Sequence, residues 1–142
     1  MPKRKWYSLI DKVWQMDNLV VAAERVVANK GAGGVDGQTC EAFAAKAELP
    51  KLHEELRTKT YRPQPVRRVF VPKANGGRRG LGVPAVRDRV VQQALRQVIE
   101  PIFEAKFLPC SYGFREGISA HMALIPSLKP WKKDGSGPSM PT

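Results

Sequence analysis

The apolar residues of segment 19–28 repeat at steps of three and four, which is the period of an amphipathic helix. The apolar stripe of this predicted helix consists of Leu19, Ala22, Ala23, Val26 and Val27. Asp17 or Asn18 is placed to cap its first turn. Residues 29–31 end the helix, and the glycine-rich segment 31–37 is expected to be a loop.

A second helical stripe begins at Val86 and predicts the longest helix of the chain. Its apolar members are Val86, Val90, Val91, Ala94, Leu95, Val98 and Ile99. Pro101 is expected to break or kink this helix, because proline lacks the N–H that a helix interior needs. Short helices are expected at residues 41–48, 50–58 and 119–124, with a loop over residues 109–115.

The segment between these helices follows a different pattern. Residues 66–71 combine β-branched and basic side chains, and residues 81–83 are expected to return as a partner strand. Asn75, Gly76 and Gly77 supply the turn between them, and the prolines in segment 61–65 keep that segment extended. The predicted fold class is therefore α+β, mostly helical with one β-hairpin.

The alternation of apolar and polar residues that predicts helices and strands ends after Leu124. Residues 125–142 contain four prolines, three serines and two glycines, and they show neither helical nor strand periodicity. Such a segment buries too little apolar surface to offset its ordering entropy. We therefore expect a partial domain over residues 1–124, followed by a disordered tail over residues 125–142.

Charge is concentrated in the middle of the chain. Between Arg57 and Arg96 there are eleven Lys or Arg residues and one acid, Asp88, so this stretch holds +10 of the net charge of +11. A concentrated basic hairpin favours polyanions such as phosphates or nucleic acid. Cys40 and Cys110 are isolated, which predicts no zinc site and suits a reducing compartment. No long apolar run follows the basic N-terminus, so we expect neither secretion nor a membrane partner.

Lys73 and Arg79 flank the predicted hairpin turn. A guanidinium fork and a compact ammonium are both suited to phosphate, and glycines allow the backbone to approach it closely. The alternative is a solvated basic turn that only protects a strand edge from aggregation. The sequence leaves both readings open.

Four ordered segments resemble the N-terminal part of group II intron reverse transcriptases, the maturase-type proteins. They are residues 18–37, including KGAGGVDG; residues 61–84, from YRP to VP; residues 87–95, RDRVVQQAL; and residues 110–121, including CSYGFR. The resemblance implies the N-terminal extension and fingers of a right-hand polymerase, without the palm. It also implies a cytoplasmic bacterial or an organellar location.

The resemblance also implies roles for single residues. Triphosphate contacts to an incoming deoxynucleotide (dNTP) would come from Arg67, Lys73 and Arg79. Together with the charge pattern, it implies RNA contacts, to an intron or a template, from Lys30, Gly31, Gly33, Arg68, Arg78, Arg87, Arg89 and Arg115.

The acids that polymerase chemistry needs are missing from the pattern. Polymerases use two metal ions held by carboxylates, whereas the aspartates here are isolated: Asp11, Asp17, Asp36, Asp88 and Asp134. Asp88, between two arginines, is expected to cap a helix or form a salt bridge. We therefore expect no catalytic residue and no metal site, with two Mg²⁺ only in a full-length enzyme. The chain is expected to be an inactive fragment of an RNA-directed DNA polymerase; the alternative is a free-standing RNA-binding module.

Overall fold

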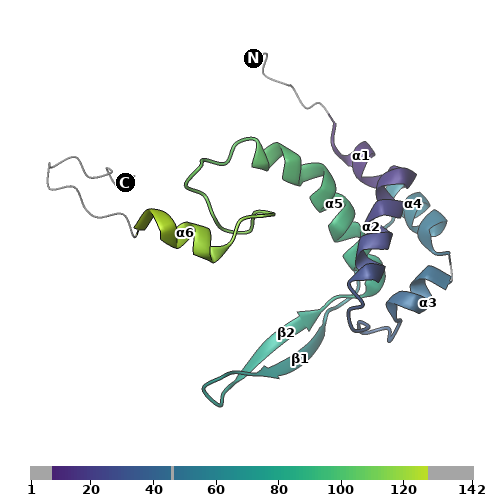
Figure 1. The fold of residues 1–142 in the computed structure, drawn as a ribbon. Coiled ribbons are helices and arrows are strands. Elements are labelled where there is room, and N and C mark those ends of the chain that lie inside the picture. The colour runs from purple at the N-terminus through teal and green to yellow at the C-terminus, as the bar shows by residue number, and fades with distance from the viewer. Residues whose placement is uncertain (1–7, 46, 128–142) are drawn as a thin grey trace, which may run out of the picture. The chain divides into compact units, whose positions relative to one another are not determined.

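The computed structural model describes residues 8–45 and 47–127. In this part the chain folds as two compact units, divided between Ile102 and Phe103. The first unit holds four helices and a β-hairpin, followed by most of a fifth helix (Figure 1). The helices are α1 (Ile10–Trp14), α2 (Met16–Ala28), α3 (Cys40–Ala45), α4 (Leu49–Arg57) and α5 (Val86–Glu104). The α+β fold class predicted from the sequence is confirmed.

The core of the first unit is built from one face of each of these helices. Leu19, Phe43, Leu52 and Val90 are almost completely buried in it, so side chains from α2, α3, α4 and α5 meet there. The other members of this cluster are Val13, Ala22, Ala23, Val26, Cys40, Val86 and Ala94. Removing these apolar faces from water is the main stabilising contribution to the unit. The stripe predicted for α2 is confirmed.

The predicted cap of α2 is wrong. The helix begins at Met16, before both candidates, and its N-cap residue Gln15 makes no side-chain cap hydrogen bond. The amide of Asn18 instead donates to the carbonyl oxygens of Val13, at 3.0 Å, and Ala94, at 3.1 Å. Asn18 thereby joins the start of α2 to α5, a contact that spans 76 positions of sequence.

Helix α5 differs from its prediction at Pro101 and in part of its apolar stripe. Pro101 lies inside it and the helix continues to Glu104, so of the expected break or kink the break is wrong. Proline's fixed φ lies within the helical range, so the helix can continue and lacks only the hydrogen bond that Pro101 cannot donate. Leu95 is exposed and Ile99 is not in the core cluster, whereas Val91 and Val98 pack against the core.

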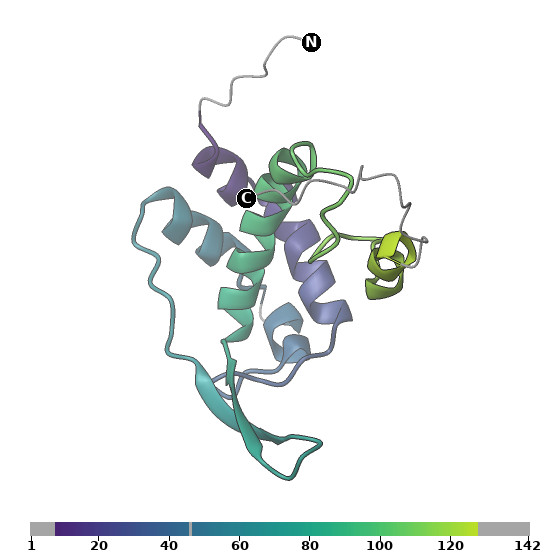
Figure 2. The same ribbon diagram turned by 90° about the vertical axis from the view of Figure 1, so that its left-hand side faces the viewer.

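The hairpin consists of β1 (Arg67–Pro72) and β2 (Arg78–Val83), paired antiparallel from Arg67 opposite Val83 to Pro72 opposite Arg78. The N–H of Lys73 donates to the carbonyl of Gly77 at 2.7 Å and closes the turn, in which Gly76 has a φ of +84°. Figures 1 and 2 show the hairpin extending away from the helices of its unit. The hairpin and its turn are confirmed, with a longer second strand than expected.

In its described residues the second unit contains the end of α5, a loop and the helix α6 (Ala120–Ser127). The loop begins after α5, as predicted, and α6 runs three residues past its expected end at Leu124. The expectation that residues 125–127 lack regular structure is therefore wrong, because proline at 126 can take the helical φ of the last turn. The rest of the predicted tail lies outside the described residues.

Candidate nucleic-acid interface

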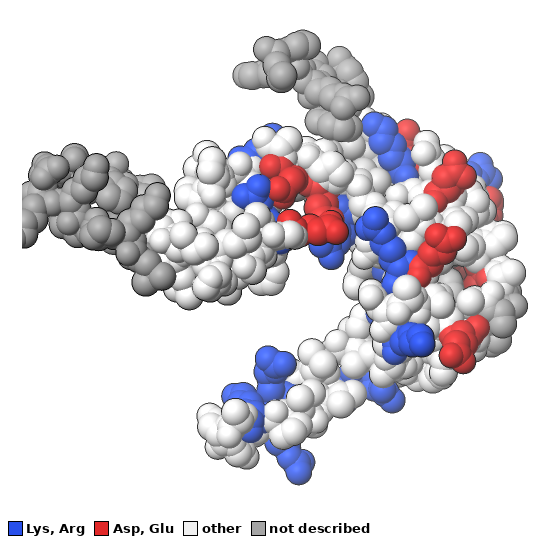
Figure 3. Space-filling model, in the orientation of Figure 1, with Lys and Arg blue, Asp and Glu red and all other residues white. Residues whose placement is uncertain are grey.

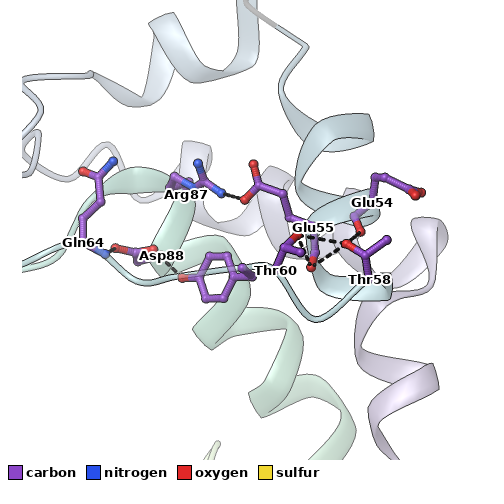
Figure 4. A network of polar contacts seen from close by, with 8 residues as sticks. Glu54, Glu55, Thr58, Thr60, Gln64, Arg87 and Asp88 are labelled. Carbon is purple, nitrogen blue, oxygen red and sulfur yellow. Dashed lines mark hydrogen bonds and ion pairs between the residues drawn. The ribbon is translucent and has the colours of Figure 1, made fainter.

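Asp88 anchors the chain where it enters the hairpin. Its carboxylate is only 3% exposed, and it accepts hydrogen bonds from the Tyr61 hydroxyl and, at 2.9 Å, from the Gln64 N–H (Figure 4). A buried carboxylate needs such donors, because leaving it unpaired in the interior is costly. The expectation of a helix cap or salt bridge for Asp88 is wrong: among the described residues its hydrogen bonds run to the extended segment before β1.

Tyr61 is held in place from two sides. Burial, and then the hydrogen bond to Asp88, raise the pKa of the Tyr61 hydroxyl, so it stays a protonated donor at neutral pH. The guanidinium of Arg87 lies 5.6 Å from the centre of the Tyr61 ring, within the range of a cation–π contact. Tyr61 is therefore a structural residue at the base of the hairpin and not a free stacking surface.

Arg87 connects α5 to α4. Its guanidinium forms an ion pair with Glu55, and the two side chains are only 19% and 24% exposed (Figure 4). At the end of α4, Thr58 and Thr60 donate to backbone carbonyls of that helix. The ion pair joins α4 to the start of α5, and the threonine hydrogen bonds close the end of α4.

The glycine loop lies against the start of α5. The guanidinium of Arg89 donates to the carbonyl of Ala32, and a side chain at Gly31 would overlap that guanidinium. A Cβ on Gly33 would lie 2.8 Å from the carbonyl oxygen of Gln38. Gly33 therefore has a packing reason to be glycine, since only a backbone without Cβ can approach another backbone so closely. At Gly31 the flexible end of Arg89 could move aside.

Gly34 gives the clearest test of this packing. Its Gly34→Ala variant is expected to lose about 2 kcal/mol of unfolding free energy, because the new Cβ would stand 2.5 Å from the Cα of Ala85. Gly113→Ala, where no atom of the described residues lies within 4 Å, should cost much less. Urea unfolding monitored by circular dichroism measures both variants. Equal stability of the two would show that the loop does not pack on α5 as described.

The register of the hairpin sorts its side chains onto two faces, because directly paired residues share a face. The first face carries Arg67, Val69, Val71, Arg79, Leu81 and Val83. The second face carries Arg68, Phe70, Pro72, Arg78, Gly80 and Gly82. Lys73 continues the alternation of β1 and belongs to the first face.

The first face thus brings together the three residues predicted to contact a triphosphate. Lys73 and Arg79 are diagonal neighbours, whose Cα atoms in an antiparallel pair are about 7–8 Å apart. Arg67 lies four residues from Val71, the partner of Arg79, which corresponds to about 13 Å along the strand. All three side chains are exposed.

The positive charge of the hairpin is not neutralised locally. Among the described residues, no acidic side chain pairs with any of its five cations, Arg67, Arg68, Lys73, Arg78 and Arg79. Figure 3 shows blue atoms and no red atoms on the visible face of the hairpin. By contrast, Arg57 and Arg96 form ion pairs with Glu54 and Glu100 on their own helices. The hairpin is therefore an open basic surface that a polyanion can approach.

Besides Gly31 and Gly33 of the glycine loop, the predicted RNA-binding residues are cations that fall into three groups. Lys30 and the hairpin arginines are exposed, with Lys30 at a φ of +46°. Arg87 and Arg89 are partly buried in the contacts described above. Arg115, in the second unit, is held by Glu104 at 2.6 Å and by the carbonyl of Ser111 at 2.7 Å, so it shapes its own loop. These contacts do not test RNA binding, and the roles stay predictions.

The described residues do not fit a two-metal site. None of their His, Cys, Asp and Glu side chains gather in a group of three or more able to hold a metal ion. Asp88, the acid closest to the hairpin in the sequence, already accepts two hydrogen bonds and is buried. In the part of the chain that the structure describes, no helix is both long and apolar enough to cross a membrane.

Several known proteins are similar to the chain over most of its length. It is 38% identical over 111 residues to the group II intron-encoded protein LtrA of Lactococcus lactis, which covers 76% of the chain and 18% of LtrA. It is 33% identical over 119 residues to a putative COX1/OXI3 intron 1 protein of Saccharomyces cerevisiae, or 82% of the chain and 14% of that protein. The chain is a homologue of group II intron-encoded proteins and intron maturases.

The homology to group II intron-encoded proteins confirms the resemblance seen in the sequence. Protein YkfC of Escherichia coli is 42% identical over 127 residues, which is 87% of the chain and 33% of YkfC. The chain thus spans from about a seventh to a third of the length of these three relatives. No family model matches it.

Proposed function

We propose that the chain is the fingers-side region of a group II intron reverse transcriptase, which binds RNA and the phosphates of an incoming dNTP. The observation that carries the proposal is the exposed hairpin, whose five cations have no acidic partner among the described residues. Homology to intron-encoded proteins makes RNA the polyanion to expect. The described residues offer no group of acids for metal catalysis, so the proposed role is binding and not chemistry.

Each face of the hairpin has its own part in the proposal. The first face offers Arg67, Lys73 and Arg79 to the triphosphate, where arginine forks and a lysine point charge are suited to phosphate oxygens. The second face offers Arg68 and Arg78 to RNA, together with exposed Lys30 at the glycine loop. Arg87 and Arg89 contribute to binding through the long-range field of the basic stretch, because their guanidinium groups are engaged inside the unit.

The RNA part of the proposal predicts strongly salt-dependent binding. If about five phosphates are neutralised, the logarithm of the binding constant should fall with the logarithm of salt at a slope near −3.5 for a single strand. The double variant Arg68→Ala/Arg78→Ala should make this slope about 1.4 less steep. Fluorescence anisotropy with a labelled oligonucleotide over a salt series measures both slopes.

Arg57→Ala is the matched control, because Arg57 is already paired with Glu54 on α4 and lies outside the hairpin. Its slope should equal that of the unaltered chain. A slope near zero for the unaltered chain, or equal slopes for the double variant and the unaltered chain, would contradict the proposal.

The alternative of a free-standing RNA-binding module is favoured by one observation. The basic surface that RNA would need lies entirely within the described residues and requires no further domain. Both functions predict the same RNA binding. They differ at the first face, which a module would not use for nucleotides.

A further inference from the structure

Phe70 is a large aromatic residue in the middle of the second face, and it is 59% exposed. Phe103, Phe107 and Phe114 are also exposed, so what distinguishes Phe70 is its setting on the basic hairpin. Phe70 is absent from the core of the helices. The ring is therefore available to a partner.

The backbone around Phe70 is unusually bare. Its cross-strand partner is Gly80, and Gly82 follows on the same face, so neither position covers the ring with a side chain. A Cβ built on Gly80 would meet the Nε of Arg68 at 3.6 Å and the Cε1 of Phe70 at 3.8 Å. The guanidinium of Arg68 and the ring of Phe70 thus both lie close to Gly80, beside each other on an open strip of backbone.

Positive charge stands on both sides of the ring. Arg68 precedes Phe70 by two residues on β1, and Arg78 is its diagonal neighbour on β2. Neither arginine has an acidic partner among the described residues. An exposed ring between two unpaired guanidinium groups matches a ligand with flat apolar faces and regularly spaced negative charges, and a single-stranded nucleic acid is such a ligand.

We infer that Phe70 is a stacking platform for an unpaired base of single-stranded RNA, with Arg68 and Arg78 binding the phosphates beside that base. This inference rests on the proposed RNA-binding function and adds a base-contacting residue on the face opposite to the proposed triphosphate residues. An exposed aromatic ring binds any base through its π face, so the platform has little sequence preference. A base-paired strand cannot use it, because its bases are already stacked.

The test compares Phe70→Ala with Leu81→Ala in the full chain. Leu81 is the matched control, because it is 46% exposed on the first face of the same hairpin. The probes are a labelled oligouridine and a labelled RNA duplex. Phe70→Ala should weaken oligouridine binding about five- to 150-fold, the range that base–aromatic stacking supplies. Duplex binding and the salt slope should stay unchanged, because no charge is removed.

Two further variants make the result specific. Phe70→Trp should retain oligouridine binding, since indole stacks at least as well as phenyl, and Leu81→Ala should bind both probes as the unaltered chain does. Equal losses on oligouridine and duplex, or no loss in Phe70→Ala, would overturn the platform while leaving the RNA-binding proposal intact. If Phe70→Ala loses no affinity for oligouridine, the ring would instead contact protein. Absence of RNA binding by the unaltered chain would overturn both proposals.

Discussion

Replacing Asp88 by alanine is expected to lower the free energy of unfolding by about 3–5 kcal/mol. The substitution removes an acceptor that is 97% buried and leaves the Tyr61 hydroxyl and the Gln64 N–H without their partner. Each hydrogen bond to a charged group is worth about 1.5–3 kcal/mol, and breaking a buried charged contact costs about 3–5 kcal/mol. Urea unfolding followed by circular dichroism gives the change directly.

Two companion variants separate this role from a general effect of charge. Asp88→Asn keeps one acceptor oxygen and should fall between the unaltered chain and Asp88→Ala. Asp17→Ala removes an exposed acid from the first turn of α2 and should cost no more than about 1 kcal/mol. If Asp88→Ala is as stable as Asp17→Ala, the hairpin is not anchored through this carboxylate.

Lys73→Ala and Arg79→Ala are each expected to lower the efficiency of nucleotide incorporation about ten- to a hundredfold in a chimera that joins this chain to the palm of a related reverse transcriptase. Each variant removes one charge-assisted phosphate contact, worth about 1.5–3 kcal/mol. Both residues lie on the first face, where the register makes them diagonal neighbours. Primer extension on an RNA template at varied dNTP concentration measures the efficiency.

The same assay contains its controls. Lys51→Ala, an exposed cation on α4 outside the hairpin, should change incorporation little. The chain without an added palm should incorporate nothing above the blank. If Lys51→Ala, Lys73→Ala and Arg79→Ala behave alike, the hairpin is only a charged turn, and the RNA-binding module becomes the better description.

The sequence by itself determined the elements that depend on short-range rules. The stripe of α2 and the turn at Asn75, Gly76 and Gly77 were predicted, because helical periodicity and turn chemistry are properties of neighbouring residues. The positive charge of the hairpin was also predicted, since it follows from the number of basic and acidic residues in the segment. Homology to intron-encoded proteins agrees with the family resemblance of the same segments.

Only the tertiary structure decided which side chains meet. Asp88 accepts hydrogen bonds from Gln64 and Tyr61, which lie 24 and 27 positions away in the sequence. Asn18 donates to Ala94 across 76 positions. The local patterns that suggested caps at Asp88 and Asn18 therefore gave the wrong partners. Leu95 fits the helical stripe but is exposed, because burial depends on what packs against a helix and not on its period alone. Strand pairing likewise put Phe70 on an open face beside Gly80, since register sets which side chains from two strands lie together.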